Sequence, residues 1–216
     1  QDGDYPVFHI TAITHRKNPT YLTTLVGKPP QEDFYLGKAT ERIFLPLMRT
    51  QLPEIIDMNM PAEGVFHNLV IISIEKRFPM QARRLMSALW GMGQMSFVKT
   101  IVVFDHTVDI QNTSILLDKL FDQIDFTQDL FFSEGILDVL NHASDRAVYG
   151  SKLGIDLTKK IKGEDEFKRT LKNDNSPPSI SPENIIKKFT EITSCKIIEK
   201  KNSHKIVLAT IDKKLM

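Results

Sequence analysis

The chain has 216 residues, 41% of them hydrophobic and 25% charged, and this balance excludes a chain that is disordered throughout. Its 28 Lys and Arg and 27 Asp and Glu nearly cancel, so no strong field favours a nucleic acid or an anionic membrane as partner. The apolar runs are far shorter than the roughly 20 residues of a membrane span. The single cysteine, Cys195, excludes an internal disulfide, so we expect a soluble protein of the reducing cytoplasm.

The first thirty residues predict extended structure. Residues 5–15 are rich in β-branched and aromatic side chains, which indicates a buried strand, and residues 21–26 continue as extended chain. The sequence Gly27-Lys28-Pro29-Pro30 predicts a rigid loop, because each proline fixes its own φ and biases the preceding residue toward extended backbone. The chain starts without Met or a signal segment, so we expect its start to be a cut end.

Helices and strands then alternate. Apolar spacing predicts helices over residues 33–51, 81–95 and 115–124, and strands over residues 54–60, 68–76, 99–105 and 130–133. In the first helix the expected buried stripe is Leu36, Ala39, Ile43 and Leu47, and Pro46 should kink or split the helix. The alternation predicts an α/β fold of three layers, with a mixed sheet covered by helices on both faces.

The composition becomes more polar after Gly150, and residues 166–180 have the composition of a linker. Ser181 followed by Pro182 is typical of a helix start, here extending to about residue 193. Residues 196–200 and 205–211 alternate around Asn202-Ser203 and predict a hairpin. We therefore expect a small C-terminal α-β-β appendage.

Residue patterns alone do not define a reaction. The six histidines do not pair at ligand spacings, and hydrolase and nucleotide fingerprints are absent. Lys99 precedes an apolar strand. Its ammonium group could bind an anion such as phosphate, or it could simply be solvated at the end of the strand. Asp105-His106 ends that strand, either as a ligand-binding pair or as a turn. Residues 150–154 (GSKLG) could cradle an anion or form a surface turn, and Gly91 and Gly93 within a helix pattern suggest close packing.

Several blocks of the chain, in order, resemble one known family. Residues 12–16 (AITHR), 27–32 (GKPPQE) and 36–37 (LG) are similar to the pattern TxITxR…TGRPPDE…LG of UbiD-type decarboxylases. Residues 52–57 (LPEIID), 61–64 (PAEG), 82–86 (ARRLM) with Trp90, 99–105 (KTIVVFD) and 150–156 (GSKLGID) resemble its later motifs. The order and spacing hold from residue 5 to about residue 160, which makes the resemblance specific.

Members of that family use prenylated flavin mononucleotide (FMN), with a divalent, manganese-like (Mn-like) metal at its phosphate, to decarboxylate aromatic or α,β-unsaturated acids, including ubiquinone and menaquinone precursors. The resemblance implies that residues 1–30 end a preceding split-barrel-like flavin-binding domain with its connecting loop. Residues 31–165 would be the family's C-terminal α/β domain, residues 166–180 a linker, and residues 181–216 a C-terminal helix and hairpin. The catalytic acids and arginine, the metal ligands and most flavin contacts would precede this chain.

The resemblance also assigns roles within the chain. Lys99 matches the lysine that reaches the flavin phosphate. Six residues match segments that border the substrate pocket: Pro30, Glu32, Phe34, Asp105, Leu140 and His142. No catalytic or metal-binding residue is expected in this fragment, which alone should be inactive and hold no cofactor.

The resemblance therefore implies the C-terminal part of a carboxy-lyase, acting on a quinone precursor acid and forming dimers or hexamers. A flavin prenyltransferase would supply its cofactor. The location would be cytoplasmic, at the membrane surface if the substrate carries a prenyl chain. The alternative is a non-catalytic α/β assembly or binding module, with a native chain of about this size and no flavin domain.

Overall fold

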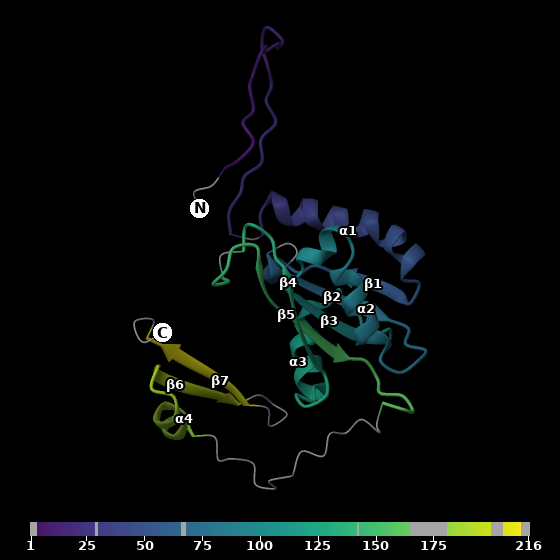
Figure 1. Ribbon diagram of the computed structural model, residues 1–216, viewed down its shortest axis with the longest axis vertical. Helices are drawn as coiled ribbons and strands as arrows, with labels where there is room; N and C mark the ends of the chain where they lie inside the picture. Colours follow the sequence, from purple (N-terminus) through teal and green to yellow (C-terminus); the bar gives the residue numbers. More distant parts are fainter. Residues whose placement is uncertain are drawn as a thin grey trace.

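The computed structural model describes residues 4–28, 30–65, 68–141, 143–164, 181–199 and 205–212. A five-stranded sheet in the order β1-β2-β3-β5-β4 forms its centre (Figure 1). These strands are β1 (Ile55–Asn59), β2 (Leu69–Ile74), β3 (Thr100–Asp105), β4 (Leu130–Ile136) and β5 (Tyr149–Leu157). The inner strands β2, β3 and β5 are parallel, whereas β1 and β4 pair antiparallel at the two sides. The predicted mixed sheet is confirmed.

Helices cover both faces of this sheet, as predicted. On one face, α1 (Glu32–Gln51) and α2 (Gln81–Trp90) pack with Ile101 and Val103 of β3; on the other, α3 (Thr113–Gln123) packs with Val102 and Phe104. Alternate strand residues point to opposite faces, so β3 contributes to both cores and is apolar almost throughout. No helix in the described ranges is both long enough and apolar enough to cross a membrane.

The buried face of α1 differs from the predicted stripe. Gly37, Glu41 and Met48 face the sheet, while Leu36 and Leu47 are exposed and Ile43 is 70% exposed. The prediction was wrong: the buried face carries the Glu41 carboxylate, which accepts a hydrogen bond from Met60 N directly after β1, and the apolar stripe lies outward. The helix also continues through Pro46 as one element rather than splitting.

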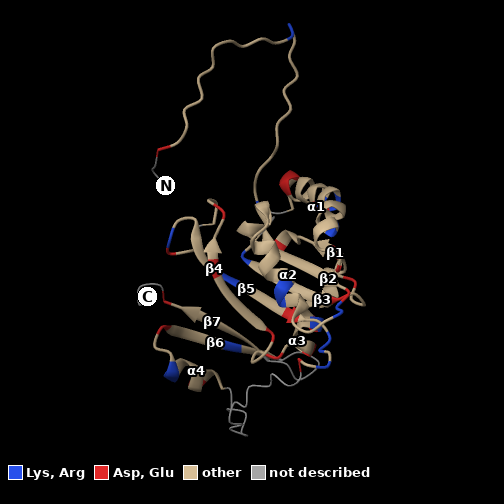
Figure 2. Cartoon of the chain, turned by 45° about the vertical axis from the view of Figure 1, so that its right-hand side comes forward, with Lys and Arg blue, Asp and Glu red and all other residues tan. Residues whose placement is uncertain are grey.

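Residues 4–28 form no strand, and every described side chain among them is exposed; Phe8 is 88% exposed. The prediction of a buried strand at residues 5–15 was therefore wrong. A strand needs a neighbouring strand for its backbone hydrogen bonds, and none of the described residues offers one to this segment. Figure 2 shows few charged residues on this arm, and its exposed apolar side chains, such as Tyr5, Phe8 and Tyr21, are interspersed with uncharged polar ones.

Alpha-helix α2 ends at Trp90, five residues before its predicted end. Gly91 follows it, and Gly93 has a φ of +45°, a left-handed conformation that favours glycine. A short 3-10 helix, η2 (Gly93–Phe97), then leads to β3. The two glycines thus end the helix instead of allowing close packing inside it, and η1 (Ala62–Gly64) similarly joins β1 to β2.

Residues 150–154 lie within β5 and form neither an anion cradle nor a surface turn. A Cβ atom on Gly150 would come within 2.8 Å of Leu137 Cδ1, and one on Gly154 within 2.3 Å of Met86 Sδ. These glycines therefore serve close packing of β5 against the β4–β5 loop and against α2.

Replacing Gly154 with alanine is expected to lower the free energy of unfolding by about 1–3 kcal/mol, the usual cost of overpacking a core. The added Cβ would displace the fully buried Met86. Urea unfolding measures the change. Gly91→Ala is the matched control, because its Cβ would meet only ordinary contacts at 3.6 Å. Equal stability of Gly154→Ala and the parent chain would contradict the packing argument.

The C-terminal residues form a separate small unit of α4 (Pro182–Lys188) and the antiparallel strands β6 (Ile192–Glu199) and β7 (Lys205–Ile211). The predicted helix start is confirmed, since Ser181 Oγ accepts a hydrogen bond from Asn184 N at 3.2 Å. The helix is shorter than predicted because β6 already begins at Ile192. The predicted linker at residues 166–180 and the turn at Asn202-Ser203 lie outside the described residues.

Candidate functional site

The candidate residues lie at two opposite edges of the sheet. We call the edge where β2, β3 and β5 begin the amino edge, and the edge where they end the carboxyl edge. Lys99 directly precedes β3 at the amino edge, and Asp105 ends β3 at the carboxyl edge. Six residues of strand separate their Cα atoms by about 20 Å. The structure therefore does not bring Lys99 and Asp105 together.

Lys99 is a half-buried cation with ordered backbone on both sides. Its carbonyl oxygen accepts a hydrogen bond from Leu153 N at 2.9 Å, and the N–H of Thr100 donates to Asn68 O at 2.8 Å. Among the described residues, no carboxylate pairs with the Lys99 ammonium group. Its charge is thus available to an anion at the amino edge.

The β4–β5 connection lies at this same edge, because Ile136 at the end of β4 pairs with Tyr149 at the start of β5. Leu140, in that connection, is 76% exposed, and its N–H donates to Asp138 Oδ1 at 2.7 Å. Ile136, Val139, Val148 and Tyr149 also expose apolar surface. His142 lies outside the described residues.

The start of α1 also points to the amino edge. Ile55, at the start of β1, pairs with Ile74, and Ile74 pairs with Asp105, so the turn between α1 and β1 lies at the carboxyl edge. The helix runs antiparallel to β1, and its first residues therefore lie toward the amino edge (Figure 1). Glu32 Oε2 accepts a hydrogen bond from Leu25 N at 3.0 Å. Phe34 is half-buried against Tyr35, their ring centroids 5.2 Å apart. Pro30, Glu32, Phe34, Lys99 and Leu140 thus share one edge of the sheet.

Sequence reasoning missed Lys152, a buried cation on β5. Its Nζ donates to Ser96 O at 2.5 Å and to Val98 O at 2.9 Å, and lies 5.9 Å from the centroid of the Trp90 ring. Burial lowers the pKa of Lys152 to about 8. Gly150 and Gly154 flank it on the same strand face, since side chains repeat every second residue. A lysine between two glycines in a strand pattern was the signal available in the sequence.

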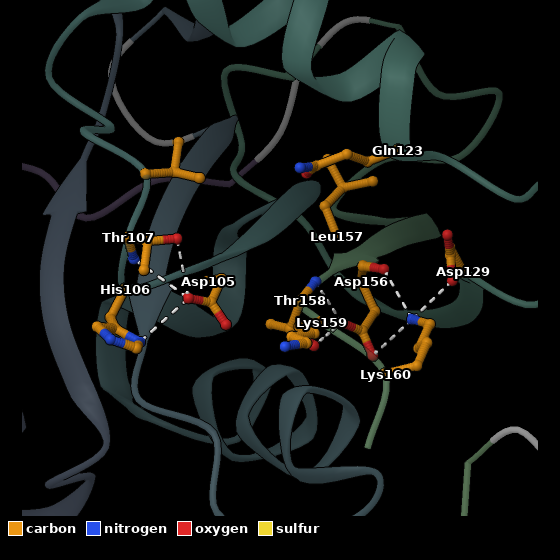
Figure 3. A pocket seen from close by; sticks show the side chains of 11 residues that line it. Asp105, His106, Thr107, Gln123, Asp129, Asp156, Leu157, Thr158, Lys159 and Lys160 are labelled. Atoms are coloured by element: carbon orange, nitrogen blue, oxygen red, sulfur yellow. Dashed lines mark hydrogen bonds and ion pairs between the residues drawn. The ribbon is translucent and has the colours of Figure 1, made fainter. Parts of the chain in front are cut away.

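The carboxyl edge holds a cavity of about 640 Å³ at the ends of β3 and β5 (Figure 3). Asp105 lies in its wall, where Oδ1 accepts hydrogen bonds from Thr107 N at 3.2 Å and Thr107 Oγ1 at 3.1 Å. His106 Nδ1 lies 3.1 Å from the same oxygen. Asp105 thus stabilises the turn after β3, and its role toward a substrate stays a prediction.

The other wall of this cavity is internally paired. Lys160 Nζ lies 2.7 Å from Asp129 Oδ1 and 3.5 Å from Asp156 Oδ2, while Thr158 Oγ1 donates to Asp156 Oδ1 at 2.5 Å (Figure 3). Burial alone would lower the pKa of Lys160, but Asp156 and Asp129 raise it above its ordinary value. These contacts hold the chain after β5 against the sheet. In the described part of the chain, no three His, Cys, Asp or Glu side chains converge as metal ligands.

Sequence models of one protein family match most of this chain. The sequence model of the 3-octaprenyl-4-hydroxybenzoate carboxy-lyase C-terminal domain matches residues 34–157, and that of the Rift-related domain of the same enzymes matches residues 1–29. A protein from Archaeoglobus fulgidus is 49% identical over 161 residues, which cover 74% of this chain and 34% of that protein. One from Aquifex aeolicus is 49% identical over 160 residues, 74% of this chain and 33% of that protein. The chain spans about a third of the length of these relatives.

Solved structures share the fold. The UbiD-class enzyme HmfF from Pelotomaculum thermopropionicum, in complex with FMN, is 25% identical with a TM-score of 0.53, covering 69% of this chain and 32% of that one. The closed form of vanillic acid decarboxylase from Sedimentibacter hydroxybenzoicus is 22% identical with a TM-score of 0.63, covering 82% of this chain and 37% of that one. The model of the family's C-terminal domain matches more than half of the residues of this chain. The chain therefore belongs to the UbiD family.

Proposed function

We propose that this chain is the C-terminal part of a cytoplasmic, homo-oligomeric decarboxylase that uses prenylated FMN. Its substrate would be an aromatic or α,β-unsaturated acid, and specifically a quinone precursor. The family description names a carboxy-lyase of 3-octaprenyl-4-hydroxybenzoate, and the related HmfF carries FMN. The domain limits at residues 30, 165 and 180 are part of this proposal.

One observation carries the proposal: Lys99 is a half-buried cation without an ion-pair partner among the described residues, at an edge rich in exposed apolar side chains. A lysine ammonium is a compact point charge suited to phosphate. Exposed apolar surface is suited to the ring system of a flavin or to a neighbouring domain. These residues therefore fit the phosphate and one wall of a flavin site. They do not fit a metal, because an ammonium group and apolar side chains are not metal ligands.

In this proposal, Lys99 binds the flavin phosphate and fixes the position of the cofactor. Phe34, Pro30 and Leu140 form apolar walls that exclude water, while Glu32 and His142 remain candidates for contact with the substrate. Asp105 lies at the opposite edge of the sheet from Lys99 and is not part of this wall. When bound, the prenylated flavin supplies the electron sink for loss of CO2. Catalytic acid–base groups would come from the rest of the protein.

Replacing Lys99 with alanine in the full-length protein should weaken FMN binding by about 1.5–3 kcal/mol, the range for a hydrogen bond to a charged group. This corresponds to a roughly 10- to 150-fold higher Kd. Titration of apoprotein with FMN, followed by flavin fluorescence, measures it. Lys119→Ala, an exposed position on α3, is the matched control. Unchanged FMN affinity in Lys99→Ala would remove Lys99 from the site.

The activity itself is tested by co-expressing the full-length protein with a flavin prenyltransferase. Purified protein should release CO2 from one or more aryl or α,β-unsaturated acids, whereas the 216-residue chain alone should not. Quinone precursor acids are the first substrates to compare with cinnamate-like and phenolic acids. Absence of both flavin and turnover in the full-length protein would favour the binding-module alternative, and turnover by this chain alone would contradict the division of roles.

A further inference from the structure

Lys152 is a buried cation whose described partners are all uncharged. Its side chain is 3% exposed, and its ammonium group donates to the carbonyl oxygens of Ser96 and Val98. The Trp90 ring face lies nearby, and such a face attracts a cation. A buried charge without a carboxylate is costly to fold, so a neutral residue of similar size would be the simpler choice for packing alone.

The two carbonyl groups that Lys152 binds belong to the backbone just before Lys99. Val98 O accepts from Lys152 Nζ at 2.9 Å and from Trp90 Nε1 at 3.0 Å, which fixes the peptide group between Val98 and Lys99. The next peptide group is fixed by the hydrogen bonds of Lys99 O with Leu153 N and of Thr100 N with Asn68 O. With both flanking peptide planes held, the direction of the Lys99 side chain from its Cα is set.

Lys152 also restrains η2. Ser96 is buried within this 3-10 helix, and its carbonyl oxygen lies 2.5 Å from Lys152 Nζ. Gly135 of β4 leaves the space that this lysine needs, since a Cβ there would lie 3.2 Å from Lys152 Cε. The Lys152 side chain on β5 thus packs against Gly135 of β4 and binds the backbone of η2.

We infer that Lys152 is a positioning residue for Lys99: through the carbonyl groups of Ser96 and Val98 it holds the Lys99 ammonium where an FMN phosphate binds. The inference rests on the proposed contact between Lys99 and the flavin phosphate. It goes beyond that contact by assigning a role to a residue that cannot itself reach solvent.

The test compares FMN with riboflavin, which lacks the phosphate, as ligands of the full-length apoprotein. Three variants are needed: Lys99→Ala, Lys152→Met and the double variant. Lys152→Met keeps an unbranched side chain of similar length but removes the donors. We expect Lys152→Met to bind FMN about tenfold more weakly, because neighbouring residues such as Lys152 and Lys99 commonly couple by about 1.4 kcal/mol. Its riboflavin affinity should be unchanged. The double variant should bind FMN no more weakly than Lys99→Ala alone.

The outcomes separate this inference from the proposed function. Unchanged FMN affinity in Lys99→Ala would overturn the phosphate contact and the inference with it. If Lys99→Ala weakens FMN binding but Lys152→Met does not, only the inference fails. Equal losses for FMN and riboflavin, or additive losses in the double variant, would show a general structural role and also overturn it.

A second variant covers the case in which Lys152→Met does not fold. Trp90→Phe removes the other donor to Val98 O and keeps an aromatic ring against Phe131. It should weaken FMN binding, by less than Lys99→Ala, and leave riboflavin binding unchanged. No loss in FMN affinity for a folded Trp90→Phe would contradict the role of the Val98 carbonyl in placing Lys99.

Discussion

Glu164→Gln is expected to lower the free energy of unfolding by about 3–5 kcal/mol, the cost of removing one partner of a buried ion pair. Lys76 Nζ and Glu164 Oε2 are 2.5 Å apart, and their side chains are only 2% and 4% exposed. Glu164 also accepts hydrogen bonds from Met80 N at 2.7 Å and Ile161 N at 3.0 Å. Glutamine would leave the Lys76 ammonium buried without a counter-charge, and urea unfolding measures the loss.

The same pair predicts a loss of stability in acid. Burial alone would raise the pKa of Glu164, but hydrogen bonds from Lys76 and from the backbone of Ile161 and Met80 lower it below its ordinary value of 4.5. The unfolded chain therefore binds a proton at this carboxylate before the folded chain does. Its contribution to stability is present above pH 4.5 and is lost as the pH falls below that value toward the folded pKa.

Two comparisons make this prediction specific. Glu75→Gln breaks the exposed pair with Arg77, 2.7 Å apart, and should leave stability unchanged, because solvent screens such a pair. The double variant Lys76→Met/Glu164→Gln should be more stable than Glu164→Gln alone, since it also removes the unpaired charge. If the double variant is no better, or if acid lowers the stability of Glu164→Gln as steeply as that of the parent, the pair is not the cause.

Glu41→Gln is expected to cost about 2–3 kcal/mol, since charge-assisted hydrogen bonds to a buried group are lost. The Glu41 carboxylate is 1% exposed and accepts from Met60 N at 2.6 Å. Lys38 Nζ lies 3.1 Å from its Oε1 and Arg42 Nη2 lies 2.6 Å from the same atom. The two cations are partly exposed, which keeps the expected loss below that of Glu164→Gln.

The network around Glu41 joins three parts of the chain. Lys38 also donates to Asn59 Oδ1 at 2.7 Å and to Gln111 Oε1 at 3.0 Å, and Arg42 Nη1 donates to Asp57 Oδ1 at 2.7 Å. Glu41→Gln should therefore increase amide hydrogen exchange in α1 more than in α2. Glu63→Gln, at an exposed position in η1, is the control and should change neither property. Equal exchange in both helices would contradict the anchoring role of Glu41.

Local patterns in the sequence predicted several elements well. The apolar spacing of residues 81–95 predicts α2 with the correct start but an end five residues too late, the dense apolar run at residues 99–105 predicts β3, and Ser181-Pro182 predicts the start of α4. These features are encoded by neighbours within a few residues, so a single sequence is enough to find them. Resemblance in ordered blocks then identified the family, which the family models confirm.

Pairing between distant segments decided the rest. Residues 5–15 carry a strand pattern but no described strand pairs with them. β5 was missed because its glycines serve contacts with Leu137 and Ser144 in the preceding connection and with Met86 of α2, which lies far away in sequence. Likewise, the separation of Lys99 from Asp105 became clear only when the order and direction of the strands were known.

By itself, the sequence determined the α/β class, the family and the candidate cation Lys99. Only the tertiary structure decided that α1 buries the Glu41 carboxylate rather than its apolar stripe, and that Lys152 is buried with its ammonium group bound to the carbonyl oxygens of Ser96 and Val98, just before Lys99. The physical reason is the same in both cases. Burial of a charge depends in part on partners from distant segments, such as Met60 N for Glu41 and Val98 O for Lys152, and a local pattern of residues does not contain them.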